Sequence, residues 1–440
     1  MRIQKEKKMK KLFYGFLKVF TAMAVILSVI ISSVSCGGDT VADIDPDDVP
    51  AIENAAKYAS FELSREKLEG ALANALLKID GAIPTFTTEF PGHTSKNNIY
   101  YPETNYKGGW NTGFWTGILW HAYELTGDEK YKNTAEAQIP SFYRRISEKI
   151  GVNHHDMGFL YTPSCVAAWK LAGDETAKEA ALLAADHLIT RYHEKAEFIQ
   201  AWGSIGDENS YRLIVDCLMN IPLLYWATEE TGDTKYRDIA YKHFSTTLSV
   251  CYREDGSTYH TYYFDPKTGL PLKGVTAQGA SDDSTWSRGQ SWGMYGPLLT
   301  YIYEEDVTAL NAFKQAANYY LNHLPEDYIA YWDLSFTEGE TEPRDSSSAS
   351  IALCALLEAV KHLPDDDPYR QIYANAAKRI MNSLIDSYTT KDTPEANGLL
   401  LHGTYSKPGN NGVDEMTIWG DYFYMEALHR MLSHEWDLYW

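Results

Sequence analysis

Residues 215–240 read VDCLMNIPLLYWATEETGDTKYRDIA, and this stretch contains the pattern that decides the fold. A mostly apolar stretch ends at Gly232, Asp233 follows, and a second stretch with helical spacing begins. Gly commonly ends a helix because it adopts the left-handed backbone conformation, and Asp caps the next helix by accepting a backbone N–H. The same Gly-Asp pair follows an apolar stretch at Gly127 and at Gly173. The sequence therefore predicts a repeated helical hairpin.

Looser copies of the hairpin occur around Asp306 and Pro364, and a last helix at residues 421–432 has a partner at 64–80. Long connections rich in Trp, His, Gly and Asp separate the pairs, at residues 82–112, 194–210, 251–287, 326–344 and 387–418. We predict an all-α fold, an (α/α)6 barrel of six helical hairpins with long rim loops. An open helical solenoid is the alternative, although no capping repeat is present.

The first 36 residues have the features of a bacterial lipoprotein signal peptide. Five lysines between residues 5 and 11 precede an apolar stretch, and small residues stand directly before Cys36. We expect Cys36 to be the lipidated first residue of the mature chain, 37–54 a flexible acidic tether, and 55–440 the barrel. This predicts a lipoprotein held in the outer or inner membrane of the cell envelope, periplasmic or surface-exposed. An ordinary secretory signal and a membrane anchor are the alternatives.

The charge of the chain limits its partners. The formal net charge is −21, and removal of residues 1–36, which hold seven basic residues and one Glu, leaves −27. Such acidity argues against nucleic-acid binding, which needs a basic surface. An anionic substrate would need a local positive pocket. The chain also has 12 Trp and 32 Tyr, which suit both a large core and a cleft that stacks against sugar rings.

Polar and aromatic segments recur where the first helix of each predicted pair begins. They are residues 109–115, 154–161, Asp216, 284–293, 344–350 and 418–424. In a closed ring of hairpins all of these would lie around one rim, so the sequence predicts a single concave polar-aromatic site. No nucleophile elbow, phosphate loop or dinucleotide fingerprint is present, and we predict no cofactor.

Asp216 and Asp156 are the candidate catalytic carboxylates, because each stands at the start of an inner helix. Two carboxyl groups in one apolar cup push their pKa values apart, which leaves one protonated at neutral pH. Asn220 lies one helical turn after Asp216 and is expected to orient it. For both aspartates the structural alternative is a helix cap, or for Asp216 a buried partner of an arginine.

Three further polar residues are candidates for polar contacts or for a metal. His154 and His155 precede Asp156, but adjacent helical residues face different ways, so we predict no metal site. Arg288, with Trp286 and Trp292 on either side, is suited to hold a carboxylate in a bidentate fork. Its structural alternative is a salt bridge to Asp282 or Asp283.

The long loops supply the remaining candidates. His260 and Gln278 would make polar contacts, and Trp110 and Trp202 would stack on a sugar. The structural alternative for the two tryptophans is simple packing. The alternation at residues 258–265 predicts a short hairpin within a loop.

Five ordered motifs, HHDMGF, VDCLMNIPLLYWA, QGASDDSTWSRGQSWGMYG, RDSSSASIA and IWGDYFYMEAL, closely resemble unsaturated glucuronyl hydrolases, glycoside hydrolase family 88. The resemblance extends from about residue 110 to 428. It implies an (α/α)6 barrel, with residues 55–440 as the catalytic domain. It also implies removal of the 4,5-unsaturated uronic acid that polysaccharide lyases leave at the non-reducing end of oligosaccharides. The implied mechanism is hydration of the C4=C5 double bond.

The resemblance assigns roles to the candidate residues. Asp216 matches the general acid/base of the family, and Asp156 matches its second essential carboxylate. The positions that match the uronate subsite are Arg288, Trp292, Trp286, Gln278, His260 and Trp110, with Trp202 in a variable loop. Ser406 and Lys407 do not clearly match the segment with which some relatives recognise a sulfated amino sugar. The preferred glycan, whether derived from chondroitin, hyaluronan, heparin or gellan, stays open.

Three other readings of the sequence remain. An unsaturated rhamnogalacturonyl hydrolase would use similar chemistry on pectin fragments, but the motif SDDSTWSRGQSWG favours the glucuronyl group. A non-catalytic glycan-binding lipoprotein would have stacking aromatic residues without a carboxylate pair. A scaffold of helical repeats would not need Trp and Asp at the rim of every unit.

Overall fold

The computed structural model describes residues 44–103, 109–337, 339, 341–433 and 436–440. The predicted signal peptide, Cys36 and residues 37–43 of the predicted tether lie outside these residues. Within the described ranges, no helix is long and apolar enough to cross a membrane.

The described chain is mainly helical, and its helices form hairpins as predicted. The first pair is α3 (Gly113–Thr126) with α4 (Glu129–Ser147). Gly127 ends α3 with φ of 69°, and the Asp128 carboxylate caps α4 by accepting the N–H of Lys130 at 3.0 Å. Gly173 and Asp174 repeat this arrangement.

The remaining pairs follow in chain order. The helices and helical turns that make them are α5 (Met157–Tyr161), η3 (Thr162–Val166) and α6 (Ala167–Ala172) with α7 (Glu175–Ile189); η5 (Val215–Met219) and α8 (Pro222–Thr231) with α9 (Lys235–Cys251); α10 (Ser287–Glu304) with α11 (Val307–Asn322); α12 (Ser346–His362) with α13 (Arg370–Ser383); and α14 (Ile418–Leu432) with α2 (Arg65–Phe86). In each pair named here the inner helix is the more buried. Every residue of α14 from Ile418 to Arg430 is buried, for example.

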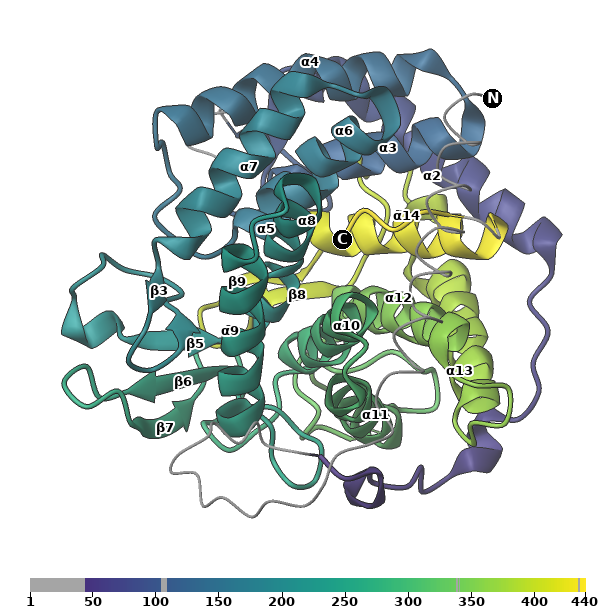
Figure 1. The fold of residues 1–440 in the computed structure, drawn as a ribbon. Helices are drawn as coiled ribbons and strands as arrows, with labels where there is room; N and C mark the ends of the chain where they lie inside the picture. The colour runs from purple at the N-terminus through teal and green to yellow at the C-terminus, as the bar shows by residue number, and fades with distance from the viewer. Residues whose placement is uncertain (1–43, 104–108, 338, 340, 434–435) are drawn as a thin grey trace, which may run out of the picture. The chain divides into compact units, whose positions relative to one another are not determined.

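The inner helices form a closed ring. Helix α14 packs against α12 on one side and against α3 on the other, which joins the last hairpin to the first. In Figure 1 the helices α4, α7, α9, α11, α13 and α2 surround the inner set. The prediction of an all-α (α/α)6 barrel is confirmed, and the open solenoid is not what forms.

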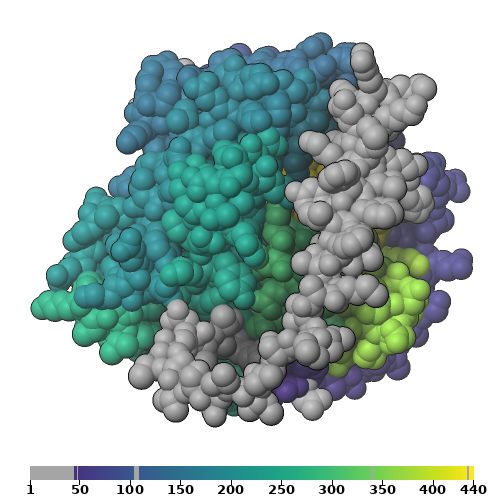
Figure 2. Space-filling view, viewed as in Figure 1, coloured from purple at the N-terminus to yellow at the C-terminus, as the bar shows by residue number. Residues whose placement is uncertain are grey.

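The rim loops contain short antiparallel strands. They are β1 (Phe90–Pro91) with β2 (Pro102–Glu103); β3 (Tyr192–His193) with β4 (Phe198–Ile199); β5 (Arg212–Ile214), β6 (Thr261–Phe264) and β7 (Pro271–Val275) in one sheet; and β8 (Gly403–Ser406) with β9 (Asn411–Glu415). The hairpin predicted near residues 258–265 is the β6–β7 pair, which forms part of the surface seen in Figure 2. Short helical turns complete the chain: η1 (Pro46–Asp48), η2 (Ala55–Tyr58), η4 (Glu208–Ser210), η6 (Leu384–Tyr388) and η7 (Thr390–Asp392).

The stretch with which the sequence analysis began is not one continuous helix. Residues 215–219 form a 3₁₀ turn, and the α-helix begins at Pro222. Proline lacks a backbone N–H and has a helical φ, so it suits the first helical position and breaks a helix that runs through it. Asp216 therefore lies in a tight turn ahead of the inner helix.

The described part of the predicted tether does not behave as a free linker. Residues 44–54 lie along α11, where three side-chain amides donate to backbone carbonyl oxygens: Asn311 to Ile44, Asn318 to Pro50 and Asn322 to Ala51. Ile52 is also buried. Side chains of the outer helix α11 supply hydrogen-bond partners that an acidic, Pro-containing segment could not provide for itself. A flexible tether remains a prediction for residues 37–43 only.

The second and third inner elements touch at backbone distance, and this contact is testable. A Cβ atom added at Gly158 would lie 2.4 Å from the Cα of Asn220 and 2.8 Å from its carbonyl oxygen. We expect Gly158→Ala to lower the free energy of unfolding by about 2 kcal/mol, because the backbone cannot move aside freely. Urea denaturation would measure the change.

Gly81→Ala is the matched control. Gly81 lies exposed in α2, and its added Cβ would meet nothing within 4 Å. Helix propensity predicts that this variant is as stable as the parent or more stable, by up to about 1 kcal/mol. Equal losses in the two variants would contradict the backbone contact as the cause.

Candidate active site

One cavity of about 200 Å³ is enclosed by the rim loops and the ends of the inner helices. Nine of the ten residues predicted for the site line it: Asp216, Asp156, Arg288, Trp292, Trp286, Gln278, His260, Trp110 and Trp202. They come from three of the long loops and from the starts of α5, η5 and α10. The ring of hairpins therefore brings together side chains that are up to 182 positions apart in the chain.

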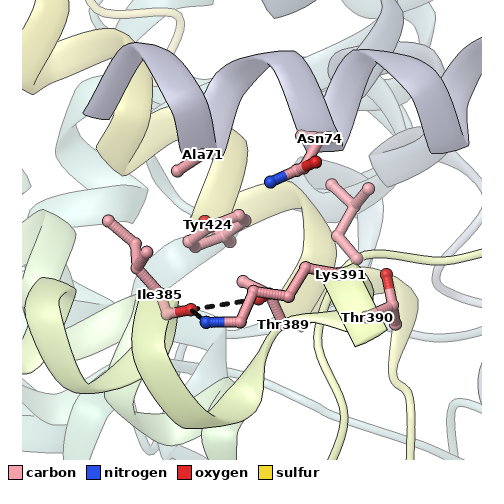
Figure 3. Close-up of a pocket in the computed structure, with 9 residues that line it drawn as sticks. Ala71, Asn74, Ile385, Thr389, Thr390, Lys391 and Tyr424 are labelled. Atoms are coloured by element: carbon pink, nitrogen blue, oxygen red, sulfur yellow. Dashed lines mark hydrogen bonds between the residues drawn. The ribbon is translucent and has the colours of Figure 1, made fainter. Parts of the chain in front are cut away.

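The other hollows described here are much smaller. Figure 3 shows one between α2 and the segment around residues 385–391, with Tyr424 at its side. Its volume is about 20 Å³, and Lys391 already donates to the carbonyl oxygen of Ile385. A third hollow has about 10 Å³. Each holds about one water molecule, so the large cavity is the candidate site.

The two predicted carboxylates meet at one imidazole in the cavity wall. His155 Nε2 lies 3.2 Å from Asp216 Oδ1 and 3.4 Å from Asp156 Oδ1. His154 contacts the other oxygen of Asp156, with its Nδ1 2.9 Å from Oδ2. The His155 side chain is fully buried, whereas that of Asp216 is 19% exposed. The exposed part of the Asp216 carboxyl can therefore reach a bound ligand.

This environment separates the protonation states of the two carboxyl groups. Burial raises the pKa of the Asp216 carboxyl, against the charge of His155 and with a contribution from Asp156. Burial acts in the same sense on Asp156, but the neighbouring His155 and His154 outweigh it and lower the pKa of that carboxyl. The two shifts have opposite signs, so the protonated form is favoured at Asp216 and the ionised form at Asp156, with His155 between them.

Asn220, predicted both to orient Asp216 and to contact substrate, is not among the residues that line the cavity, and its substrate contact stays a prediction. Its side-chain oxygen accepts the N–H of Phe159 at 2.9 Å, and its side-chain nitrogen donates to the backbone oxygen of Asp216 at 3.1 Å. Both polar atoms are used in joining two inner elements. Asn220 thus positions Asp216 through the main chain, because the break before Pro222 turns its side chain away from the Asp216 carboxyl.

Arg288 lines the cavity, but its structural partner is neither Asp282 nor Asp283. Its Nη1 lies 3.0 Å from an oxygen of the buried Asp345, and its Nη2 donates to Gln278 Oε1 at 2.6 Å. The same two nitrogens donate to the carbonyl oxygens of Thr404 and Tyr405. The charge of Arg288 is therefore compensated within the protein, and Gln278 is held by it.

Aromatic rings form most of the remaining cavity wall. Trp286 lies under the Arg288 guanidinium, 4.4 Å from ring centre to Cζ. Trp202 stacks on His154 with ring centres 5.2 Å apart and planes inclined by 23°. It is 38% exposed, which leaves one face of this ring open to a ligand. Such surfaces suit the apolar faces of sugar rings.

His260 is held as a neutral acceptor. Burial and the charges of Arg288 and Arg212 lower its pKa to about 3. Its Nδ1 accepts the N–H of Ala277 at 3.0 Å, and its ring centre lies 4.5 Å from that of Trp286. With Nδ1 occupied, Nε2 carries the proton and can act as a hydrogen-bond donor.

Two groups of side chains among the described residues have donor atoms close enough to hold a metal ion: His155, Asp156 and Asp216, and His121, Glu124 and His429. In the second group the two histidines already hydrogen bond through Nδ1 atoms 3.0 Å apart. Glu124 accepts hydrogen bonds from two neighbouring aromatic side chains. The chemistry derived below needs only protons from the first group.

Four cavity residues were not selected from the sequence: Arg212, Ile214, Ala277 and Tyr405. A signal for two of them was present, because Arg212, Ile214 and Asp216 alternate along the chain. Alternate residues of a strand share one face. Tyr405 lies in the segment that was considered only for Ser406 and Lys407, and no local pattern singles it out.

A helical barrel with an aromatic cavity and a pair of carboxyl groups whose pKa values shift in opposite directions is the arrangement of a glycosidase. The family model for Glycosyl Hydrolase Family 88 matches residues 82–435. The chain therefore belongs to Glycosyl Hydrolase Family 88.

Individual relatives are similar to this chain in sequence and structure over most of its length. An unsaturated chondroitin disaccharide hydrolase of Streptococcus agalactiae is 47% identical over 398 residues, which cover 90% of this chain and 99% of the relative. The crystal structure of an unsaturated glucuronyl hydrolase of Streptococcus agalactiae superposes with a TM-score of 0.87 at 48% identity, covering 89% of this chain and 98% of that one. A mutant of the S. agalactiae unsaturated glucuronyl hydrolase in complex with dGlcA-GalNAc6S gives a TM-score of 0.80 at 44% identity, with the same coverage.

The contact between His155 and the carboxyl groups predicts a pH effect. Activity that requires protonated Asp216 is present below the pKa of this carboxyl and is lost as the pH rises through it. The positive charge of His155 lowers that pKa, so His155→Gln should raise it. We expect the alkaline limb of the pH–activity profile to move to higher pH by about one unit.

The acid limb should move in the same direction, because Asp156 also loses the charge that lowers its pKa. His187→Gln is the control, since His187 bonds only the carbonyl oxygen of Val152. An alkaline limb that stays in place, or moves to lower pH, in His155→Gln would contradict the assignment.

Proposed function

We propose that this glycosidase removes the 4,5-unsaturated uronic acid from the non-reducing end of lyase-generated oligosaccharides. The observation that carries the proposal is the buried Asp216 carboxyl, whose pKa is raised while that of the neighbouring Asp156 is lowered, which favours a proton on Asp216. The 200 Å³ cavity around it suits a small sugar, and its tryptophans offer stacking surfaces. Its family membership supports the same activity.

The reaction begins with proton transfer from Asp216 to C4 of the unsaturated ring. Protonation leaves a cation shared by C5 and the ring oxygen, and a water molecule adds at C5 while Asp216 takes up its proton. The resulting hemiketal opens to a ketone at C5. C1 is then a hemiacetal that expels the neighbouring sugar. Asp216 acts first as acid and then as base, and it ends the cycle protonated as it began.

The neighbouring groups support both protonation states of Asp216. Ionised Asp156 disfavours loss of the Asp216 proton before substrate arrives, and it can accept hydrogen bonds from ring hydroxyls. His155 contacts Asp216 Oδ1, so the other oxygen is left to deliver the proton. When Asp216 is transiently ionised, the His155 N–H stabilises it.

The polar and aromatic residues of the wall hold the uronate ring. His260, with its proton on Nε2, and the amide of Gln278 are placed to donate to the sugar, and Trp286 and Trp292 bound its apolar face. These roles rest on their position in the cavity around Asp216. The Arg288 guanidinium fixes Gln278 and adds positive potential from behind the wall.

We infer that the substrates are glycosaminoglycan fragments of the chondroitin type, since the S. agalactiae relative is named for them and a mutant structure holds dGlcA-GalNAc6S. A pectin-directed rhamnogalacturonyl activity has no separate observation in its favour. A non-catalytic glycan-binding role would leave the pKa separation of Asp156 and Asp216 without use.

We further propose that the enzyme is a lipoprotein of the cell envelope, attached to a membrane through Cys36. The support is in the sequence: a lysine-rich start, an apolar stretch, and small residues directly before Cys36. A periplasmic or surface location matches a substrate produced outside the cytoplasm by polysaccharide lyases.

Replacement of Asp216 by Asn tests the catalytic role. Asn keeps the shape of a protonated carboxyl but cannot donate a proton to carbon. We therefore expect kcat to fall at least about 100-fold with the fold retained. Loss of the ultraviolet absorbance of an unsaturated chondroitin disaccharide measures the rate.

Asp365→Asn serves as the control, because this side chain is 95% exposed on the loop between α12 and α13. It should leave the rate unchanged. Turnover by Asp216→Asn at the parental rate would rule out Asp216 as the acid.

The lipid anchor is tested by Cys36→Ala expressed with the complete chain. The parent should sediment with the membrane fraction and incorporate a labelled fatty acid, and the variant should do neither. Cys251→Ala is the control, since Cys251 is buried in α9. An unlabelled parent in the soluble fraction would refute the anchor while leaving the enzymatic proposal intact.

A further inference from the structure

The cavity contains two arginines, and only one of them is compensated. Arg288 pairs with the buried Asp345, and both of its terminal nitrogens donate hydrogen bonds within the protein. Arg212 also lines the cavity, but it forms no ion pair with any residue that the structure describes, and its one side-chain hydrogen bond is from Nη1 to Tyr263 Oη at 2.9 Å. In a chain of net charge −21, an arginine left unpaired in the active-site cavity is an unusual feature.

Arg212 lies at the outer part of the site. Strand β5 (Arg212–Ile214) leads into η5, which carries Asp216, and α8 continues from there into the barrel wall. Arg212, Ile214 and Asp216 share the cavity-facing side. At roughly 3.3 Å per strand residue, the backbone of Arg212 is on the order of 10 Å from that of Asp216. In Figure 1 this strand lies beside β6, which supplies Tyr263.

We propose that Arg212 binds an anionic substituent, a sulfate ester in the first place, on the sugar that leaves. The proposal rests on the proposed function, which places the unsaturated ring against Asp216. The leaving sugar must then extend from that ring toward the open side of the cavity. Arg212 is partly exposed in this cavity, and its Nε and Nη2 make no hydrogen bond to any described residue, so they can form the parallel pair of bonds that sulfate and carboxylate oxygens accept.

Arg212 is also distinct from the groups that would surround the uronate ring. Arg288, His260 and Gln278 form the wall close to Asp216, and the Arg288 charge contributes to the pKa of the Asp216 carboxyl. The charges of both Arg288 and Arg212 lower the pKa of His260, so this ring lies close to both arginines. Arg212 is thus the second positive charge of the site, beyond the groups that surround the reacting ring.

Two neighbours hold the Arg212 side chain in place. The Tyr263 ring lies 5.4 Å from its Cζ, and the Tyr263 hydroxyl accepts one of its N–H groups. Asp207 is the carboxylate whose pKa Arg212 helps to lower, but its oxygens are bonded to Ser210 and Asn209. An orienting aromatic side chain and an uncommitted charge are what a specificity residue requires.

The experiment compares two unsaturated disaccharides that differ only in one sulfate, dGlcA-GalNAc6S and its unsulfated form. Purified full-length protein, Arg212→Gln and Arg212→Lys are assayed with both. In Arg212→Gln we expect kcat/KM for the sulfated substrate to fall about 10- to 100-fold and that for the unsulfated one to change less than about twofold. Arg212→Lys should recover most of the loss, because it restores the charge.

Two further variants separate selectivity from general damage. Tyr263→Phe keeps the Arg212 charge but removes its hydrogen bond, so it should reduce the sulfated rate selectively and by a smaller factor. Arg65→Gln removes an exposed arginine of α2 that pairs with Glu69, and it should change neither rate. Added salt should weaken the preference of the parent for the sulfated substrate and leave Arg212→Gln unaffected.

The outcomes are distinct. Equal losses on both substrates in Arg212→Gln would assign Arg212 to the uronate or to the fold, and no loss on either would leave it without a role in binding; each result overturns the proposal. A parent that cleaves only the unsulfated disaccharide also overturns it. A parent that cleaves neither refutes the proposed function itself, and this proposal with it.

Discussion

The site depends on a contact between two short irregular elements, the start of α5 and the turn η5. Gly158 and Asn220 meet there at backbone distance, and the Asn220 side chain joins Phe159 to the backbone of Asp216. No side chain larger than hydrogen fits at Gly158. This contact fixes the relative position of the two main-chain segments that carry Asp156 and Asp216, and so allows one imidazole to touch both carboxyl groups.

That imidazole governs the electrostatics of the site. Two carboxyl groups close together cannot both ionise easily, so their pKa values separate, and the neighbouring charges decide which group keeps the proton. The charge of His155, together with His154, lowers the pKa of Asp156. At Asp216 the effect of burial is larger than that of His155, so the pKa of this carboxyl stays raised. The barrel fixes the relative positions of the three groups, which maintains this difference. One proton can therefore move to substrate and return without any other group of the wall changing its charge.

The polar groups of the cavity wall are of two kinds: some form hydrogen bonds within the protein, and others are free to bind a ligand. Both Arg288 terminal nitrogens, the Gln278 side-chain oxygen, the Asp345 carboxylate and both polar atoms of the Asn220 side chain form hydrogen bonds within the fold. The exposed oxygen of Asp216, the free face of Trp202 and the outer nitrogens of Arg212 are not engaged. Rigid, satisfied residues hold the wall in place, and the unsatisfied ones lie where a sugar would enter.

The sequence by itself determined the hairpin repeat and the class of site. Gly127, Gly173 and Gly232 end helices because they alone tolerate the left-handed conformation, and the following aspartates cap the next helix; both effects are local. Apolar helical stretches with polar, aromatic starts implied a ring with one rim. Only the tertiary structure decided which partners each polar group takes. Arg288 bonds to Asp345, 57 positions away, and not to its neighbours Asp282 and Asp283, and residues 44–54 attach to asparagines of α11. A buried polar group forms a hydrogen bond with whichever partner lies within reach. Which partners lie within reach depends on the distant segments that the closed ring brings together. No local sequence pattern contains this information.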